Sequence, residues 1–316
     1  MTTVGATDMF GKFDVPGVRV FVLDVRGTDP TSDLTLLSRE ERDRAARFAR
    51  ALDRAAFIAG RAAMRRMLAD ELGLAPARVA IVAGKHGRPR LAPELGSLVD
   101  FNVTHASTCV AGALARSGAR VGIDVESTSA VRDLDILIQE VTGVRERTLL
   151  AHLQGVERVN AFLACWTRKE AIAKAVGTGV AYPLRNIDLP DEPIDGAISF
   201  QCCDVGMEMC RSWMIRTASS LSGEFVLSIA VHGHQTPFRA TTLSLPSSHS
   251  VSGVGIAAVS ADVQTVVACK FPPLRRTLMP KSSVSVLGRR YPAVSSSTGR
   301  APTQAGQPIS RASAAS

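Results

Sequence analysis

Two carboxylates that stand two residues apart are the first candidates for chemistry in this sequence. They are Asp124 and Glu126, in the segment GIDVE. Because alternate residues of a strand share a face, these two side chains would point together while Ile123 and Val125 face the core. Neighbouring carboxylates repel each other unless a cation lies between them, and such oxygen ligands suit Mg²⁺. The alternative is a strand whose acidic face simply lies in solvent.

A carboxylate and an ammonium four residues apart form the second candidate. Glu170 and Lys174 lie in the segment WTRKEAIAKAVGTG, residues 166–179, and would share one face of a helix. An acid that holds a cation beside a base that meets a phosphate is typical of a metal–phosphate site. The alternative is a surface ion pair, which stabilises a helix by only about 0.3–0.5 kcal/mol.

Two earlier segments have the polar groups that an anion needs. The segment KHGRPR, residues 85–90, predicts a basic, turn-rich loop that could approach an anion closely. Thr104 and His105 end a short apolar run, and His105 could donate a hydrogen bond to a phosphate. The alternatives are a solvated basic loop and a structural histidine.

The elements that must position these residues follow from periodicity and capping signals. Ser38 predicts a helix start, and Gly73 and Gly177 predict helix ends. The expected helices span residues 39–52, 55–72, 133–140, 145–153 and 157–176. The expected strands span residues 18–25, 78–83, 196–203, 211–217 and 224–231, with a loop over 84–96 and a hairpin of 109–115 and 119–125 around Ser117-Gly118.

Strands mixed with a long helix therefore occur twice, over residues 18–115 and 116–235. Residues 1–17 form an N-terminal extension to these two halves. From residue 236 to 316 the chain is rich in Ser, Pro and Ala and loses its periodicity, so we expect a largely disordered tail. Within it, residues 251–269 are apolar enough for a strand or a short helix.

The charge of the chain is concentrated in this tail. The whole sequence carries a formal net charge of +8, and residues 239–316 hold nine Lys or Arg but a single acid, Asp262. The remainder is therefore neutral, which argues against a nucleic-acid partner for the folded part. An alternative, a basic-tailed protein that binds nucleic acid or a membrane surface, would need the other motifs to be coincidental.

Composition also bears on compartment and on other kinds of site. Six cysteines without a CxxC pair indicate neither a zinc site nor a disulfide framework, so we expect inert thiols in a reducing cytoplasm. The sequence contains no run of eighteen uncharged apolar residues, so we expect no membrane span. The first 16 residues lack the basic and apolar regions of a signal peptide.

Taken in order, GRPRL, FNVTHA, GIDVE and WTRKEAIAKAVGTG resemble the motifs of the Sfp-type 4′-phosphopantetheinyl transferases. The earlier AGRAAMRRML, residues 59–68, matches a helix of the same family, and the resemblance covers about residues 30–231. It implies transfer of the phosphopantetheine arm of coenzyme A to a serine of an apo acyl or peptidyl carrier protein, with release of 3′,5′-ADP. It also implies an α/β (α+β) pseudo-dimer of two similar halves, each a small, mostly antiparallel sheet with a long helix.

The resemblance assigns roles to residues at matching positions. Asp124, Glu126 and Glu170 would bind Mg²⁺, with Glu170 also the first candidate for the base and Lys174 at the pyrophosphate. The residues expected on the nucleotide of coenzyme A are Thr104 and His105 at the 3′-phosphate, and Gly87, Arg88 and Pro89 at the adenine.

The sequence departs from the family pattern at some positions. The position first expected to hold a phosphate-binding arginine is Ala56, so Arg50 and Arg54 are both candidates. An aromatic pair is missing before Glu146, which leaves the choice of carrier open and makes Glu146 a second candidate for the base. The alternative function is a catalytically inactive relative that binds coenzyme A and carriers. We expect a monomer, since two halves in one chain complete the cleft.

Overall fold

The structure is a computed structural model, and it describes residues 9–11, 13, 15–84, 87–177, 183–189, 196–202, 211–233, 285–286 and 289–290. Contacts divide the chain into two units, residues 1–272 and 273–316. The first unit holds the two sheets and the helices described below. In the second, the described residues form two short antiparallel strands, β10 (Ser285–Val286) and β11 (Arg289–Arg290), within the range expected to be disordered.

The first sheet of the large unit is antiparallel, and one long helix packs on it. Its strands, in spatial order, are β1 (Val18–Asp24), β5 (Cys109–Ala115) and β4 (Asp100–Ala106). Helix α3 (Ala51–Leu72) packs its buried side chains against β4 and β5. Helix α2 (Arg39–Ala46) lies beside α3, and the small pair β2 (Ile81–Ala83) and β3 (Pro89–Leu91) follows it.

The second sheet is also antiparallel and has a helix of the same length. Its strands, in spatial order, are β6 (Arg120–Ser127), β9 (Phe225–His232), β8 (Arg211–Ser219) and β7 (Gly196–Cys202). Helix α6 (Gly155–Val176) packs against β6 and β9, preceded by α4 (Leu134–Val141) and α5 (Val144–Ala151). The described residues also form short 3₁₀ helices: η1 (Thr31–Leu36), η2 (Pro76–Arg78), η4 (Pro93–Leu95), η5 (Thr128–Ala130) and η7 (Leu184–Asn186).

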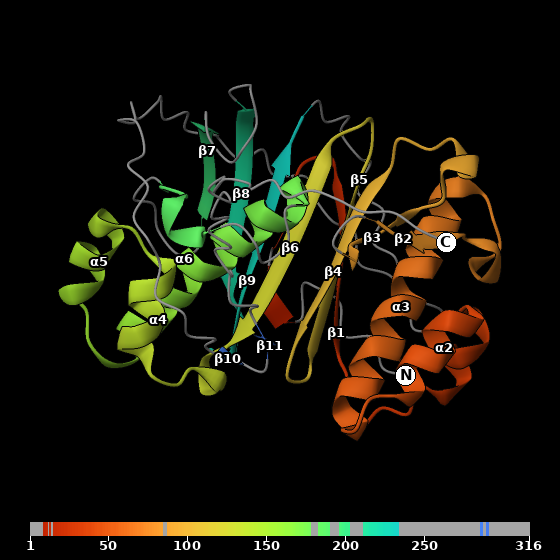
Figure 1. Cartoon of the computed structure of the whole chain (residues 1–316), viewed down its shortest axis with the longest axis horizontal. Coiled ribbons are helices and arrows are strands. Elements are labelled where there is room, and N and C mark those ends of the chain that lie inside the picture. Colours follow the sequence, from red (N-terminus) through yellow and green to blue (C-terminus); the bar gives the residue numbers. More distant parts are fainter. Residues whose placement is uncertain are drawn as a thin grey trace, which may run out of the picture. The chain divides into compact units, whose positions relative to one another are not determined.

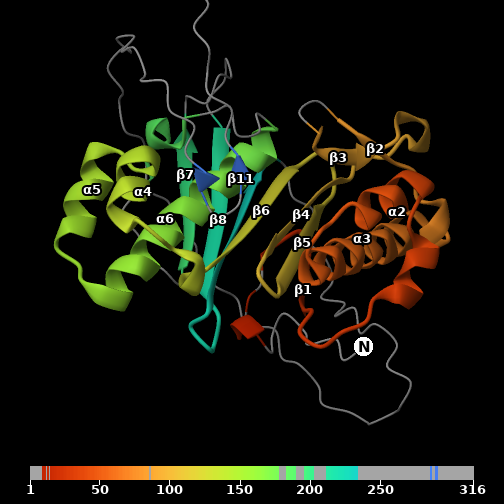
Figure 2. The ribbon, with the colours of Figure 1, turned by 60° about the horizontal axis from the view of Figure 1, so that its bottom comes forward.

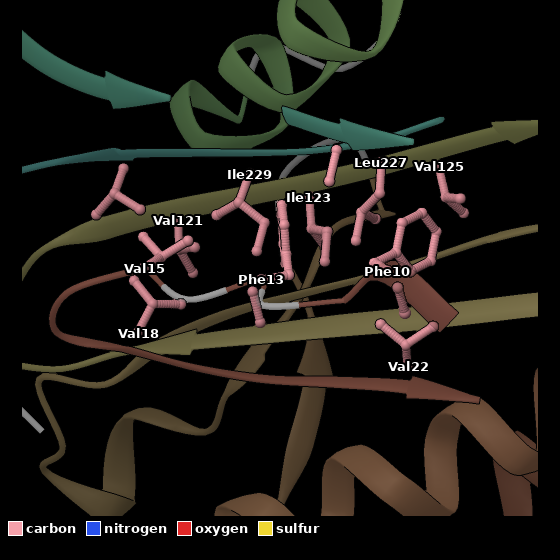
Figure 3. Packing of buried hydrophobic residues seen from close by; sticks show 14 of the residues in the cluster. Phe10, Phe13, Val15, Val18, Val22, Val121, Ile123, Val125, Leu227 and Ile229 are labelled. Carbon is pink, nitrogen blue, oxygen red and sulfur yellow. The ribbon is translucent and has the colours of Figure 1, made fainter. Parts of the chain in front are cut away.

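The main hydrophobic core fills the space between the two sheets. Val121, Ile123 and Val125 of β6 face Val18 and Val22 of β1 across it, and Figure 3 shows these side chains pointing toward one another. Helices α3 and α6 lie on the outer faces of the two sheets, as Figure 2 shows. Strands β4 and β6, each at the edge of its own sheet, run side by side (Figure 1).

The capping signals in the sequence mark real helix ends. Ser38 accepts a hydrogen bond from the Glu41 amide at 3.2 Å and donates its own amide to Glu41, which is a capping box. Gly73 and Gly177 end α3 and α6 in the left-handed conformation. The helix expected over 39–52 is shorter, because α2 already ends at Ala46 and α3 begins after Arg50.

The predicted hairpin of residues 109–115 and 119–125 is wrong. Strand β5 pairs with β1 and β4 along its two edges, so it has no edge left for β6, which pairs with β9. The turn at Ser117-Gly118 instead carries the chain from one sheet to the other, and its left-handed conformation makes the change of direction possible. The loop expected over 84–96 also contains β3 and η4.

Two further observations bear on the predictions. The apolar stretch 251–269 lies outside the described residues. Among the helices that the structure describes, none is long and apolar enough to cross a membrane.

Candidate active site

The candidate site lies along the seam where β4 and β6 run side by side. The side chains of Asp100 and Asn102 of β4 accept hydrogen bonds from the free edge of β6, as the main chain of a neighbouring strand would. The Val121 amide donates to Oδ2 of Asp100 at 2.9 Å, and the Ile123 amide donates to Oδ1 of Asn102 at 3.0 Å. Side-chain oxygens therefore satisfy the backbone groups that an edge strand leaves open, and they fix β6 against the first sheet.

The two acids of β6 are buried and face helix α6. Asp124 is 0% and Glu126 is 4% exposed. They share a face of the strand with Gly122, whose Cα lies directly under the main chain of α6. Ile123 and Val125 point the other way, into the core between the sheets. The predicted orientation of GIDVE is thus confirmed, and its acidic face meets a helix rather than solvent.

Lys174, in the last turn of α6, reaches across to both sheets. Its ammonium Nζ donates to Oδ1 of Asp124, to Oγ1 of Thr104 at 3.1 Å and to the carbonyl oxygen of Ile123 at 3.1 Å. Thr104 in turn donates to Oδ1 of Asp124 at 3.2 Å. The structure therefore brings together three residues that lie far apart in the sequence, one each from β4, β6 and α6.

Glu170 lies one turn before Lys174 on α6, and its side chain is buried. Residues four apart on a helix share a face, so Glu170 and Lys174 are on the side of α6 that meets β6. The side chain of Thr167, also on this side, hydrogen bonds to Ser228 of β9 at 2.7 Å. Ser228 is paired in register with Asp124, so the polar side of α6 lies over the acids of β6.

Glu146, the second candidate for the base, has structural partners in α5 and α6. Its Oε2 accepts hydrogen bonds from the ammonium of the fully buried Lys169 and, at 2.8 Å, from the Gly143 amide at the start of α5. Lys169 also donates to the carbonyl oxygen of Val141 at 3.1 Å. Glu146 therefore compensates a buried charge and caps a helix.

Arg88 is turned toward the end of α6. Its guanidinium donates to carbonyl oxygens of Lys174, Ala175, Phe101 and Val121, and it forms an ion pair with Asp100 at 2.8 Å. Its expected place at an adenine stays a prediction. Burial lowers the pKa of Arg88 from its usual value, and the carboxylate of Asp100 opposes that shift.

The remaining candidates for the nucleotide lie at the surface or in short elements. His105 is exposed, and it points to the opposite face of β4 from its neighbour Thr104. Arg50 and Arg54 are both exposed at the start of α3. Gly87 is exposed with a φ of +77°, and Pro89 begins β3. Lys85 and His86 of the same loop, and the end of the WTRKEAIAKAVGTG motif at residues 178–179, lie outside the described residues.

Ala56, the position first expected to hold a phosphate-binding arginine, is a core residue. It is 1% exposed and packs with Val25, Ala59 and Val110. An arginine would bury a charge at this position, which explains why the residue is small and apolar.

Asp100 and Asn102 were not among the residues predicted for the site. Both precede Thr104 at intervals of two in a strand that was read only as an apolar run. This polar alternation, at positions 100, 102 and 104, was the signal that one side of β4 meets something other than a hydrophobic core.

The chemistry of the acids fits Mg²⁺. Asp124, Glu126 and Glu170 offer hard carboxylate oxygens from a strand and from the helix that covers it, and Mg²⁺ prefers such ligands. Lys174 supplies the positive charge at Asp124 in this arrangement. As the side chains stand, no three His, Cys, Asp or Glu within the described ranges are gathered closely enough to hold a metal ion.

Comparisons with known proteins indicate one family for both halves of the chain. Residues 120–230 match the family model of the 4′-phosphopantetheinyl transferase superfamily, and residues 29–116 match that of the 4′-phosphopantetheinyl transferase N-terminal region. The 4′-phosphopantetheinyl transferase HetI of Nostoc sp. is 34% identical over 161 residues, 50% of this chain and 67% of HetI. The chain belongs to the 4′-phosphopantetheinyl transferase superfamily.

Other relatives extend the comparison. The slr0495 protein of Synechocystis sp. is 31% identical over 157 residues, 50% of this chain and 63% of that protein. The matched part of the chain thus spans about two thirds of the length of these two superfamily members. A holo-(acyl-carrier-protein) synthase of Bacillus anthracis is 21% identical, with a TM-score of 0.26 over 36% of this chain and 94% of that chain.

Proposed function

We propose that the protein is an active, Sfp-type 4′-phosphopantetheinyl transferase that uses Mg²⁺. It transfers the phosphopantetheine arm of coenzyme A to a serine of an apo acyl or peptidyl carrier protein and releases 3′,5′-ADP. The observation that supports this best is the convergence of Lys174, Thr104 and Asp124 at the seam between the sheets. It places an ammonium, a hydroxyl and a buried carboxylate at one point, as phosphoryl transfer from a pyrophosphate requires.

In the proposed reaction, the serine hydroxyl of the carrier attacks the phosphorus that bears the pantetheine arm. A new bond forms between the serine oxygen and phosphorus, and the bond between this phosphorus and the bridging oxygen of the pyrophosphate breaks. Glu170 takes the serine proton, and Lys174 stabilises the negative charge that remains on 3′,5′-ADP. All three N–H donors of the Lys174 ammonium are held by protein acceptors, so this group acts on the leaving group through its fixed positive charge.

Asp124, Glu126 and Glu170 would hold the metal ion. When bound, Mg²⁺ supplies positive charge that neutralises the pyrophosphate. Glu170 is favoured over Glu146 as the base because it lies on the side of α6 that meets the acids of β6, whereas Glu146 is the counter-ion of the buried Lys169.

The nucleotide end of coenzyme A is assigned to the first half of the fold. We propose that Thr104 and His105 contact the 3′-phosphate, with Arg50 or Arg54 adding positive charge, and that Gly87 and Pro89 line the adenine. The exposure of His105, Arg50, Arg54 and Gly87 supports contact with a ligand.

We propose that these carriers belong to polyketide, nonribosomal-peptide or fatty-acid synthesis. We propose a monomer that works in the cytoplasm, without nucleic acid or membrane as partners. Free thiols at Cys109 and Cys165 support a reducing compartment. A catalytically inactive relative that only binds coenzyme A and carriers is less well supported, because all three acids and Lys174 are present.

Release of 3′,5′-ADP tests this function. Coenzyme A, Mg²⁺ and the protein are incubated with an apo carrier protein, and nucleotides are separated by chromatography. We expect 3′,5′-ADP in proportion to carrier, and none with a carrier whose acceptor serine is replaced by alanine. Coenzyme A binding without release, on both acyl and peptidyl carriers, would instead establish the inactive relative.

A further inference from the structure

Arg88 joins three elements that are distant in the sequence. It lies between β2 and β3 in the first half of the fold, and its side chain is only 13% exposed. Nη1 donates to the carbonyl oxygens of Lys174 and Ala175 at the end of α6. Nη2 donates to Asp100 at 2.8 Å, to the Phe101 carbonyl at 3.2 Å and to the Val121 carbonyl at 2.8 Å, so the same guanidinium also holds β4 and β6.

The end of a helix is a suitable place for this cation. The last four carbonyl groups of a helix have no partner within the helix, and together they carry a partial negative charge. A guanidinium fits because its planar, forked donors reach several acceptors at once, whereas an ammonium acts as a point charge. Arg120 adds a second guanidinium, whose Nε donates to the Ala175 carbonyl at 3.2 Å.

Arg88 and Arg120 both lie close to Gly177, the residue that ends this helix. Gly177 closes α6 with a φ of +83°, and a Cβ on it would lie 3.5 Å from Nη2 of Arg120 and 3.9 Å from Nη1 of Arg88. Asp100 supplies the negative charge on the opposite side of Arg88 and also accepts from the Val121 amide. The last turn of α6 is therefore fastened to both strands of the seam.

Lys174 is held at both of its ends by this arrangement. Its carbonyl oxygen accepts from Arg88, and its ammonium lies on Asp124, Thr104 and the Ile123 carbonyl. Displacement of the last turn of α6 would move the ammonium relative to Asp124. A displacement of about 1 Å at a catalytic group can lower a rate about 100-fold.

We propose that Arg88 is a positioning residue for the transfer reaction, which holds the end of α6 on the β4–β6 seam so that the Lys174 ammonium lies at Asp124. This inference rests on the proposed function. It gives the Arg88 guanidinium a role within the protein in place of the expected contact with the nucleotide. Both Nη atoms are already engaged with protein groups. Arg78, an exposed arginine in η2 of the same half of the fold, is the matched control.

Steady-state kinetics separate positioning from nucleotide contact. We expect Arg88→Ala to lower kcat about 10-fold or more while KM for coenzyme A changes less than about 3-fold. Arg88→Lys keeps the charge but reaches fewer acceptors, so its kcat should be intermediate, and Arg78→Ala should match the wild type. A raised KM for coenzyme A with an unchanged kcat would overturn the proposal.

A double-mutant cycle with Lys174 identifies the route of the effect. If Arg88 acts through Lys174, Arg88→Ala should change the single-turnover rate less than about 2-fold in a Lys174→Ala background. An equally large loss in both backgrounds would show that Arg88 acts elsewhere, and would contradict the proposal.

Hydrogen exchange tests the structural part without any activity. Amides of the last turn of α6, in peptides that span residues 170–177, should exchange faster in Arg88→Ala and Arg88→Lys than in the wild type or in Arg78→Ala. Unchanged exchange would overturn the proposal. If the wild type transfers nothing, the proposed function fails, while this measurement still decides whether Arg88 holds the helix. Should Arg88→Ala not fold, Arg88→Lys serves in all three experiments.

Discussion

Gly122 of β6 lies in contact with Ala171 of α6, with no room for a side chain between strand and helix. A Cβ on Gly122 would stand 1.9 Å from the carbonyl oxygen of Ala171 and 2.6 Å from the amide nitrogen of Ala175. This approach sets the depth of α6 on the second sheet. It also sets the distance between Lys174, on the same helix as Ala171, and Asp124, on the same strand as Gly122.

Gly122→Ala should therefore destabilise the fold strongly. The clash is with main-chain atoms, which move only if the whole helix moves, and overpacking of this kind costs about 1–3 kcal/mol or more. Chemical denaturation measures the loss. Gly143→Ala is the control, since a Cβ there would have ordinary contacts of 3.5 Å or longer, and its free energy of unfolding should change by less than about 1 kcal/mol. Equal stabilities of the two variants would contradict the packing described.

Asp124→Asn should abolish transfer and leave the fold intact. Asparagine keeps the shape of the side chain and an oxygen that accepts from Lys174 and Thr104, but it removes the charge that would hold Mg²⁺. We expect kcat to fall at least about 100-fold in a protein that still folds, with a lower thermal midpoint because the ammonium of Lys174 loses its counter-ion. Glu224→Gln, at an exposed acid, should retain full activity. Turnover near the wild-type level in Asp124→Asn would rule out the metal assignment.

Loss of charge at the two candidates for the base should affect different quantities, kcat for Glu170 and the free energy of unfolding for Glu146. Glu170→Gln should lower kcat about 10²–10⁴-fold, the usual contribution of a general base. Glu146→Gln should lower the free energy of unfolding by about 3 kcal/mol, because it leaves the buried Lys169 charge without a counter-ion, while kcat per folded molecule is kept. Quench-flow rates and urea unfolding measure both quantities. The reverse pattern would make Glu146 the base.

The buried thiol of Cys109 should make the free energy of unfolding fall at alkaline pH. Burial, with a smaller effect of Asp24, raises the pKa of the Cys109 thiol from 9.0 to about 12. Above about pH 9 the unfolded chain loses this proton and the folded chain keeps it, so the free energy of unfolding falls as pH rises toward 12. Cys109→Ala, which fits among Ala111 and Ala113, removes this contribution.

Denaturation of both proteins between pH 7 and 10.5 measures the effect of Cys109. The difference in the free energy of unfolding between the wild type and Cys109→Ala should be constant below about pH 8. Above that pH, the free energy of unfolding of the wild type should fall relative to that of the variant. Parallel curves over the whole range would show that the thiol ionises as readily in the folded protein as in the unfolded chain.

Much of the fold was predictable because its signals are local. Ser38, Gly73 and Gly177 mark helix ends through capping and the left-handed conformation, which depend on neighbouring residues alone. The partner of a strand is not local. Residues 109–115 and 119–125 look like a hairpin, yet β5 is already paired on both edges and β6 belongs to the other sheet.

The site was predictable in part for the same reason. Strand and helix periodicity placed Asp124 with Glu126 and Glu170 with Lys174. The direction in which the Arg88 side chain points was not predictable, because a loop has no periodicity. The acceptors of Arg88 also come from α6 and from both strands of the seam, which are distant in the sequence. The alternation of polar residues at positions 100, 102 and 104 predicts a polar side of β4. It does not predict that Asp100 and Asn102 accept hydrogen bonds from β6, because that contact forms only where the two sheets meet.

The intact mass of a carrier protein tests the central claim most directly. An apo acyl or peptidyl carrier is incubated with this protein, coenzyme A and Mg²⁺, and a parallel sample contains EDTA. The account predicts that the carrier gains the mass of one phosphopantetheine arm and that EDTA prevents the gain. A carrier of unchanged mass across several carrier types, from a protein that binds coenzyme A, would contradict it.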